Sequence, residues 1–398
     1  MRFLTIDDVM TKEKTVFLRV DMNCPMDSET MEIADKSRIE ESIPTIESLA
    51  DSKLVIASHQ GRVGNTDYTG MGKHAAVLEQ MLGRKIRYVE DIIGEAAQHA
   101  IRNLKKGEIL MLDNLRLCAE ENYEFSPKDA AKTIMVSRLS RLFDVCVLDS
   151  FPSAHRSHPS IVGFQNTIQA CAGRIVEKEI RELDKIISVA KAPHVVVLGG
   201  LKVADRLEAI SLLIKNGQAD HILLTGVIAS VFLRAQARIK YPLGIDREDE
   251  MVRKAHYLIG EYRDVFSTPV DIAIERNGKR VEIMVRELVA GDCILDIGPE
   301  TVAHYEKIIV GAGTVFISGP AGFFENEQFC HGTEKLLKSV ANSMATTIVS
   351  GGHLTAALKK YGLYEKINHT STAGGALVLY LAREKLPMIA ALEKAASN

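Results

Sequence analysis

The feature that most constrains the fold is a regular alternation of short apolar runs with longer segments of helical periodicity. In the first half, β-rich runs predict buried strands at 15–22, 53–59, 108–114 and 145–150. Between them, apolar residues recur at helical spacing over 38–51, 75–83, 91–104 and 128–143. The second half repeats the scheme, with strands predicted at 194–200, 221–226, 314–320 and 346–351. Such alternation predicts parallel sheets covered by helices, formed twice along the chain.

The length supports two domains, because 398 residues exceed what one ordinary core organises. The boundary is expected in the segment 174–193, which carries a single apolar stripe and stops at Pro193. A helix joining two sheets would have this pattern, but so would an ordinary crossover helix. Periodicity alone leaves both readings open.

Composition narrows the functional classes. Apolar residues make up 46% and charged residues 25% of the chain, which is typical of a soluble globular protein. The formal net charge of -3 gives no global attraction to nucleic acid or anionic lipid, so neither is expected as a partner. The six cysteines form no Cys-x-x-Cys motif, and no run reaches membrane-spanning length. We therefore expect reduced, mostly buried thiols and a cytoplasmic location.

Polar residues gather where the predicted strands of the first half end. The segments are R-V-D-M-N-C-P (19–25), S-H-Q-G-R (58–62), D-N-L-R (113–116) and D-S-F-P-S-A-H-R-S-H (149–158). Ligands of parallel sheets bind beyond the carboxyl ends of the strands. Each basic residue alone would more often be a solvated surface charge, but together they predict a pocket for a small, highly charged anion. These residues are Arg38, His59, Arg62, Arg116, His155 and Arg156.

In the second half, glycines occupy the corresponding positions. They occur in V-V-L-G-G-L-K-V-A-D-R (196–206), I-S-G-P-A-G-F-F-E (317–325) and I-V-S-G-G-H-L-T (348–355). Glycine lets the backbone approach a ligand, and the start of a helix offers free N–H groups to phosphate. A tight strand–helix turn also needs glycine, but three such turns favour a nucleotide-binding domain. The P-loop and G-x-G-x-x-G motifs are missing, which disfavours a P-loop NTPase and a dinucleotide dehydrogenase.

Taken in order, these segments resemble the motifs of the phosphoglycerate kinase family over nearly the whole chain. L-D-I-G-P-E-T (295–301), H-T-S-T-A-G-G-A (369–376) and L-P-M-I-A-A-L (386–392) extend the resemblance, and the short insertions and His353 look most like archaeal members. The resemblance implies an α/β fold of two Rossmann-like domains with parallel sheets, joined by a helical hinge. Residues 1–173 would bind 3-phosphoglycerate, 174–192 would form the hinge helix, 193–377 would bind the nucleotide, and 378–398 would pack back on the first domain.

The resemblance also implies an activity. It is the reversible transfer of a phosphoryl group between 1,3-bisphosphoglycerate with ADP and 3-phosphoglycerate with ATP, a step of glycolysis and gluconeogenesis. Mg²⁺ would be bound with the nucleotide, and the two domains would have to close before transfer. Because the acceptor carboxylate is ionised at neutral pH, catalysis would consist of positioning and charge stabilisation.

The family's residue roles carry over to matching positions of this chain. The 3-phosphoglycerate site would comprise Asp21, Asn23, Arg38, His59, Arg62, Arg116 and Arg156, with His155 as a supporting neighbour. The nucleotide site would comprise Gly199, Gly200, Lys202, Arg206, Gly226, Pro320 and Glu325, with Gly351, Gly352, His353 and Leu354 over the terminal phosphates. Catalysis would be carried by Arg38, Lys202 and the backbone N–H groups of Gly351 and Gly352.

Four positions depart from the common family pattern. His353 stands where an Asp that helps to hold Mg²⁺ is common, so the protein ligand of the metal is unknown. Ser318 replaces an Asn, Ala373 a Gly and Arg206 a Lys. A non-catalytic nucleotide-binding relative is the main rival reading, and a dehydrogenase is a second. Arg38 and Lys202 argue against the first, because a pure binder needs no transition-state cations.

Overall fold

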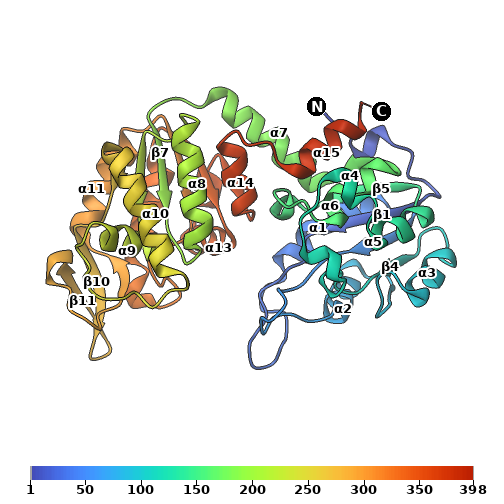
Figure 1. Ribbon diagram of the computed structural model, residues 1–398, viewed down its shortest axis with the longest axis horizontal. Coiled ribbons are helices and arrows are strands. Elements are labelled where there is room, and N and C mark those ends of the chain that lie inside the picture. The colour runs from blue at the N-terminus through green and yellow to red at the C-terminus, as the bar shows by residue number, and fades with distance from the viewer. Residues whose placement is uncertain (1, 398) are drawn as a thin grey trace. The chain divides into compact units, whose positions relative to one another are not determined.

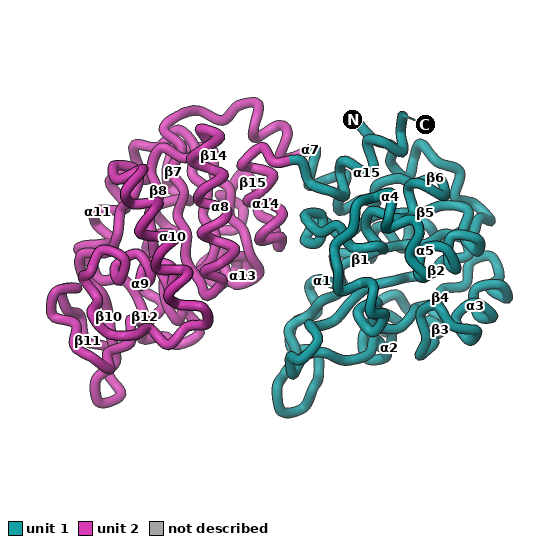
Figure 2. The backbone as a smooth tube through the Cα atoms, in the orientation of Figure 1, with its two compact units in different colours: residues 1–181, 385–398 teal, residues 182–384 magenta. Residues whose placement is uncertain are grey.

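The computed structural model describes residues 2–397, which form two compact units (Figures 1 and 2). Unit 1 runs to Arg181 and includes the end of the chain from Lys385, and unit 2 spans Glu182–Glu384. Each unit contains a six-stranded sheet in which all neighbouring strands are parallel. The predicted fold class is therefore confirmed.

The sheet of unit 1 has the strand order β3-β4-β2-β1-β5-β6. Its strands are β1 (Thr15–Val20), β2 (Lys53–Ala57), β3 (Ile86–Tyr88), β4 (Ile109–Met111), β5 (Val145–Asp149) and β6 (Gln169–Ala172). Parallel neighbours need crossover connections, which helices provide. The helices of this unit are α1 (Ser37–Ser48), α2 (Gly72–Leu82), α3 (Glu95–Arg102), α4 (Pro127–Ala130), α5 (Ile134–Leu139), α6 (Pro159–Val162) and α15 (Pro387–Ala395).

Strand β1 shows how the sequence builds the core and the site together. Leu18 belongs to an apolar cluster that includes residues of α1 and α2. On the opposite face, Phe17 stacks on Phe164 with 4.5 Å between ring centroids. Arg19 follows on this same face, because side chains alternate along a strand, and it is only 1% exposed. A guanidinium at this depth requires protein partners, and these are described below.

The parallel sheet of unit 2 has the order β15-β14-β13-β7-β8-β9. Its strands are β7 (His194–Leu198), β8 (His221–Leu224), β9 (Phe266–Ser267), β13 (Thr314–Ser318), β14 (Thr346–Ser350) and β15 (His369–Ser371). Its helices are α8 (Val203–Lys215), α9 (Gly226–Ala235), α10 (Glu248–Glu261), α11 (Pro299–Val310), α12 (His331–Asn342), α13 (Gly352–Lys360) and α14 (Gly375–Leu381). All eight strands predicted from the sequence are present, and each ends one to three residues before its predicted end.

Unit 2 also contains a three-stranded antiparallel sheet that the sequence analysis did not predict. Its order is β11-β10-β12, with β10 at Asp271–Arg276, β11 at Lys279–Met284 and β12 at Ile294–Ile297. Asn277 and Gly278 join β10 to β11 with φ of 55° and 73°, as a two-residue hairpin turn requires. The Asn-Gly signal was present in the sequence, but an expectation of parallel strands alone gave it no role.

Helix α7 (Arg174–Val189) contains the point at which the two units divide. At its start, the buried carboxylate of Asp149 accepts hydrogen bonds from the backbone N–H groups of Ile175 at 2.8 Å and Val176 at 3.1 Å. In its second half, Asp184 accepts a hydrogen bond from the Tyr380 hydroxyl at 2.6 Å. The helix predicted at 174–193 is thus present, with one half tied to each unit.

Two boundaries differ from expectation. The segment 128–143 is not one helix, because α5 begins anew where Glu120 accepts hydrogen bonds from the N–H groups of Ile134 and Met135 and Thr133 accepts one from Val136. Residues 378–384 cluster with unit 2, so the segment returning to unit 1 begins at Lys385. Within residues 2–397, no helix is long and apolar enough to cross a membrane. All six cysteines are free, and four of them are buried.

Candidate active site

Asp21 and Arg38 form the best-defined charged pair at the carboxyl edge of the unit 1 sheet. Arg38 Nη1 donates to Asp21 Oδ1 at 2.6 Å, and the Arg38 and Asp21 side chains are 24% and 7% exposed. Burial alone would raise the pKa of Asp21, but the positive charges of Arg38 and Arg19 outweigh it and hold that pKa well below its ordinary value. Asp21 is therefore a carboxylate that orients Arg38, and the partly exposed guanidinium retains capacity for an anionic ligand.

Asn23 and Arg116 meet on the backbone of Gly61. Asn23 Oδ1 accepts from the Gly61 N–H at 2.8 Å, and Arg116 Nη1 donates to the Gly61 carbonyl. Gly61 has φ of +66° and a backbone neighbour where a Cβ would lie, so only glycine fits this turn. The first, second and third strand-end motifs are thus joined at one point, with exposed Arg62 next in the chain.

The electrostatic state of this region indicates an anion site. Burial lowers the pKa of Arg116, and the positive charges of Arg19 and Arg62 lower it further. Like-charged guanidiniums held close together repel one another, and an anion bound among them would remove that repulsion. The arrangement therefore suits a ligand carrying more than one negative charge.

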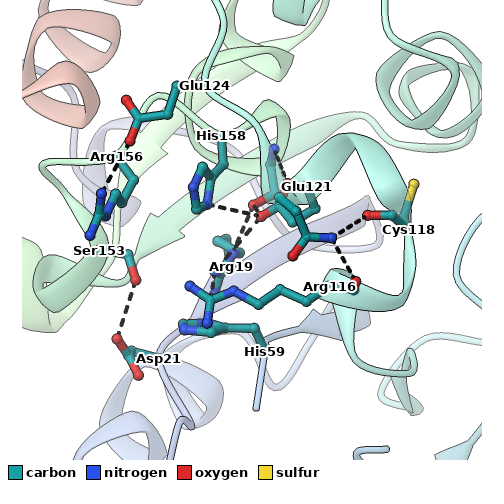
Figure 3. Close-up of polar contacts among 12 residues, drawn as sticks. Arg19, Asp21, His59, Arg116, Cys118, Glu121, Glu124, Ser153, Arg156 and His158 are labelled. Carbon is teal, nitrogen blue, oxygen red and sulfur yellow. Dashed lines mark hydrogen bonds and ion pairs between the residues drawn. The ribbon is translucent and has the colours of Figure 1, made fainter. Parts of the chain in front are cut away.

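The fourth motif contributes a loop that follows β5. Ser153 Oγ donates to Asp21 Oδ2 at 3.3 Å, which ties the loop to the Asp21–Arg38 pair (Figure 3). Arg156 Nη1 lies 3.3 Å from Glu124 Oε1, and the Arg156 side chain is 34% exposed. His155 precedes it and is half-buried. Arg156 is thus paired with a carboxylate that the sequence analysis did not consider.

A second, fully buried layer lies next to these residues and was missed from the sequence. It consists of Arg19, Glu121 and Ser160, and Figure 3 shows the first two beside His59 and His158. Arg19 stood in the first motif, so a signal existed for it, whereas Ser160 lies just beyond the fourth motif. Glu121 lies in a short 3-10 helix (Ala119–Asn122), where no periodicity predicts burial.

In unit 2, the turns after β7 and β13 pack backbone against backbone. The Gly200 N–H donates to the Pro320 carbonyl at 3.0 Å, and the Gly226 N–H donates to the Ala321 carbonyl at 3.0 Å. A Cβ at Gly199 would overlap the Pro320 carbonyl, and one at Gly319 would overlap the Gly199 carbonyl. We call this set the glycine junction. Close packing of the backbone explains why these positions are glycine. The sequence alone could not distinguish this reason from phosphate binding, because both require glycine after a strand.

The predicted cations of unit 2 lie at the start of α8. Lys202 is the N-cap residue of this helix and is exposed. Arg206 lies one turn later and is half-buried, and burial lowers its pKa to about 10. Within residues 2–397, Arg206 Nε and the buried Ser318 Oγ have no hydrogen-bond partner. Arg206 and Ser318, two of the four departures from the family pattern, therefore carry polar atoms to which a ligand could form hydrogen bonds.

Glu325 and His353 come together, as their assignment to one site requires. His353 Nε2 lies 3.9 Å from Glu325 Oε1, and the imidazole packs at 5.8 Å from the Phe324 ring. Both side chains are well exposed, at 69% for His353 and 48% for Glu325. Their donor set, one carboxylate and one imidazole, suits Mg²⁺ poorly on its own, since that ion prefers oxygen ligands. It does fit an ion that is bound mainly through nucleotide oxygens and water.

The turn before α13 has the geometry expected of a phosphate-facing helix start. Gly351 has φ of +106°, and Gly352 is the first residue of the helix. A Cβ at either glycine would meet no atom within 4 Å, so this turn is open where the glycine junction is crowded. Leu354 differs from the prediction in one respect, because its side chain is buried in the apolar core and only its backbone is left for a ligand.

Comparison with known proteins gives a consistent result. A family model described as phosphoglycerate kinase matches residues 6–384. The phosphoglycerate kinase of Methanothermus fervidus is 41% identical over 404 aligned residues, which cover 99% of this chain and 98% of that protein. Phosphoglycerate kinase 1 of Methanosarcina acetivorans is 42% identical, with coverage of 100% and 97%. The crystal structure of phosphoglycerate kinase from Pyrococcus horikoshii OT3 matches with a TM-score of 0.87 at 36% identity, covering 99% of each chain. The structure of phosphoglycerate kinase from Coxiella burnetii matches with a TM-score of 0.70 at 28% identity, covering 99% of this chain and 100% of that one.

Proposed function

This chain belongs to the phosphoglycerate kinase family, and on that premise we propose that the basic cluster of unit 1 and the glycine turns of unit 2 are its two substrate sites. The reaction is the reversible transfer of a phosphoryl group between 1,3-bisphosphoglycerate with ADP and 3-phosphoglycerate with ATP, in which a carboxyl group is the acceptor. It is a step of glycolysis, and a cytoplasmic location is proposed with it.

The 3-phosphoglycerate site is assigned to unit 1. A ligand with a phosphate at one end and a carboxylate at the other needs several separate donors, and the basic cluster supplies them. The proposed set is Asp21, Asn23, Arg38, His59, Arg62, Arg116 and Arg156, with His155 beside them. The single observation that carries this assignment is the meeting of Asn23 and Arg116 on the Gly61 backbone, which brings three of the strand-end motifs to one point. Arg156 would leave Glu124 for the ligand, since their contact is long and partly exposed.

The nucleotide site is assigned to unit 2. Gly199, Gly200, Gly226 and Pro320 would lie against the nucleotide, Glu325 would bind the ribose, and Arg206 with Lys202 would meet phosphate oxygens. The N–H groups at Gly351 and Gly352, which begin α13, would hold the terminal phosphate, with His353 and the Leu354 backbone beside it. The unpartnered Arg206 Nε and Ser318 Oγ support a polar ligand at this edge.

Catalysis then requires no proton transfer by the protein, because the attacking carboxylate is already ionised. Arg38 would hold that carboxylate and neutralise charge that develops on the moving group, and Lys202 would do the same from the nucleotide side. Backbone N–H groups at Gly351 and Gly352 would donate hydrogen bonds to the same developing charge without reorganisation. Mg²⁺ bound with the nucleotide would supply further charge neutralisation.

Calorimetry tests the unit 1 assignment. The chain should bind 3-phosphoglycerate far more tightly than inorganic phosphate at matched ionic strength, because phosphate alone engages only part of the cluster. Equal affinities would mean that the cluster is a general anion patch. A coupled assay of ATP turnover with 3-phosphoglycerate, run on the same preparation, checks the activity itself.

A further inference from the structure

Arg19 stands in the first sequence motif but has no place in the proposed ligand set. It lies in the interior of unit 1 with Glu121 and His59 (Figure 3), and Ser160 contacts both Arg19 and Glu121. Arg19 comes from β1, His59 from the segment after β2, Glu121 from the chain after β4, and Ser160 from α6. A buried polar group joining four segments of the site needs a reason beyond stability, because an apolar cluster of similar volume would be at least as stable.

The guanidinium of Arg19 is engaged on all sides by protein atoms. Its Nε donates to Ser160 Oγ at 3.0 Å, and its Nη1 donates to the Val20 carbonyl. Its Nη2 lies 4.0 Å from Glu121 Oε1. At 1% exposure, Arg19 therefore cannot itself hold a ligand, in contrast to Arg38 and Arg62.

Glu121 holds Arg19 in a fixed orientation. Its Oε2 accepts from the Ser160 N–H at 3.0 Å, and its Oε1 accepts from the Ser160 hydroxyl. Burial raises the pKa of Glu121, while the charge of Arg19 and the hydrogen bonds from Ser160 act in the opposite direction. Ser160 thus bridges the two charges, accepting from one and donating to the other.

The remaining contact of Arg19 reaches His59. Arg19 Nη2 lies 3.1 Å from His59 Nδ1. Every nitrogen of a guanidinium carries hydrogen and can only donate, so Nδ1 of the imidazole must be the acceptor. A neutral imidazole with an unprotonated Nδ1 carries its proton on Nε2. The contact therefore determines the tautomer of His59.

We propose that Arg19 is a positioning residue that fixes His59 as the neutral Nε2–H tautomer, so that His59 serves the anion site as a hydrogen-bond donor at every working pH. This inference rests on the proposed function of His59 in binding 3-phosphoglycerate. An imidazole in the other tautomer would present a lone pair on Nε2, which repels an anionic oxygen. The orientation of one buried guanidinium thus decides whether His59 attracts or repels the ligand.

The charges around His59 support a donor that does not titrate. Burial lowers the pKa of His59 far below its ordinary value, and the positive charges of Arg19, Arg116 and Arg38 lower it further. Asp21 acts in the opposite direction but does not prevail. These groups come from β1 and its end, from α1 and from the segment after β4.

The direct test is nitrogen NMR of the full chain labelled with ¹⁵N in the histidine rings. The His59 signals are assigned as those lost in His59→Gln. The proposal expects one unprotonated nitrogen, Nδ1, and one protonated nitrogen, Nε2, with shifts that stay constant between about pH 5.5 and 8. A proton on Nδ1, or a titration within that range, overturns the proposal from the wild-type spectrum alone, whether or not any variant folds.

Variants connect the tautomer to function. In Arg19→Gln/Glu121→Gln both buried charges are removed together, and the new carboxamide can accept as well as donate, so both His59 tautomers should appear. The KM for 3-phosphoglycerate should rise about tenfold to a hundredfold, the range expected when a hydrogen bond to a charged group is lost, while the KM for ATP stays unchanged. Ser160→Ala, a milder change, should shift both readouts in the same direction.

The matched control is Ser52→Ala, which also removes a buried hydroxyl of unit 1 but one that bonds only the Leu49 carbonyl. It should leave the tautomer and both KM values as in wild type. An unchanged tautomer and an unchanged KM in the double variant would refute the positioning role. A normal KM for 3-phosphoglycerate in His59→Gln would instead refute the proposed function of His59, which the tautomer spectrum does not test.

Discussion

Replacing Arg38 with alanine should lower both the stability of the protein and its turnover, but by very different amounts. The Arg38–Asp21 contact is 2.6 Å, with Asp21 nearly buried and Arg38 about a quarter exposed. Removing one partner of a fully buried pair costs about 3–5 kcal/mol. Because water can reach the space that Arg38 leaves, we expect the free energy of unfolding to fall by about 2 kcal/mol. Turnover should fall much further, by about a thousandfold or more, because the lost cation acts on the transition state.

The assay pairs steady-state turnover with urea unfolding on the wild type and four variants. Arg38→Ala and Asp21→Asn are measured singly and together, so that the double variant no longer contains a buried, unpaired carboxylate. We expect the double variant to recover part of the stability that Arg38→Ala loses but none of its turnover. Arg38→Lys is the matched control, since it keeps the charge without the paired donors, and it should keep more activity than alanine.

The reasoning would be refuted by either of two results. Turnover of Arg38→Ala within tenfold of wild type per folded molecule would remove Arg38 from the mechanism. Recovery of both stability and turnover in the double variant would mean that the loss came from disordering of the site around Asp21 and not from a missing transition-state charge.

Three further predictions concern unit 2 and the start of α7. Lys202→Ala should lower kcat far more than the melting temperature, whereas a helix-capping role alone would lower the melting temperature and leave the rate per folded molecule intact. His353→Gln should weaken ATP binding measured by calorimetry, because the imidazole would no longer contact a phosphate oxygen; an unchanged affinity would exclude that contact. Burial raises the pKa of Asp149 to about 6 from an ordinary 3.8, so the folded state favours its protonated form and the free energy of unfolding should decline as pH rises through that interval. Subtracting the pH profile of the unfolding free energy of Asp149→Asn from that of wild type should isolate this decline, which totals about 3 kcal/mol at most. A difference that increases with pH would contradict the predicted direction.

The parallel sheets could be predicted because their signal is local. Runs such as 145–150 are apolar throughout, and the burial of β5 on both faces explains why. The antiparallel sheet was missed although Asn277 and Gly278 carry a strong hairpin signal, because the alternation elsewhere favoured parallel pairing. The break at 131–133 was missed for a different reason: the group that caps α5 is Glu120, which lies outside the segment whose periodicity was being interpreted.

The ligand set could be proposed from the ends of strands, but its supporting residues could not. Asp21 and Arg38 are close in sequence and lie at one sheet edge, so their pairing follows from topology. Arg19 and Glu121 are separated by about a hundred positions, and only the packed structure brings them together. A clue was available, since a charged residue inside an apolar strand must have a partner in the interior, but the sequence does not say which carboxylate it is.

The crowding at the glycine junction has a consequence for how this protein can change over evolutionary time. Positions 199 and 319 have no room for even a methyl group, and the polar atoms they present are those of the peptide chain itself. A substitution can change a side chain, but only proline removes an amide N–H, and proline cannot adopt the φ of +83° found at Gly319. A mutation in the glycine junction can therefore disrupt its backbone packing, but it cannot adjust by small steps the polar groups that the junction presents. Side chains that border the junction can be substituted without this restriction. Arg206 and Ser318 are two bordering positions at which this chain departs from the common family pattern. Attempts to alter nucleotide preference by directed evolution should accordingly yield substitutions along that border and none within the junction.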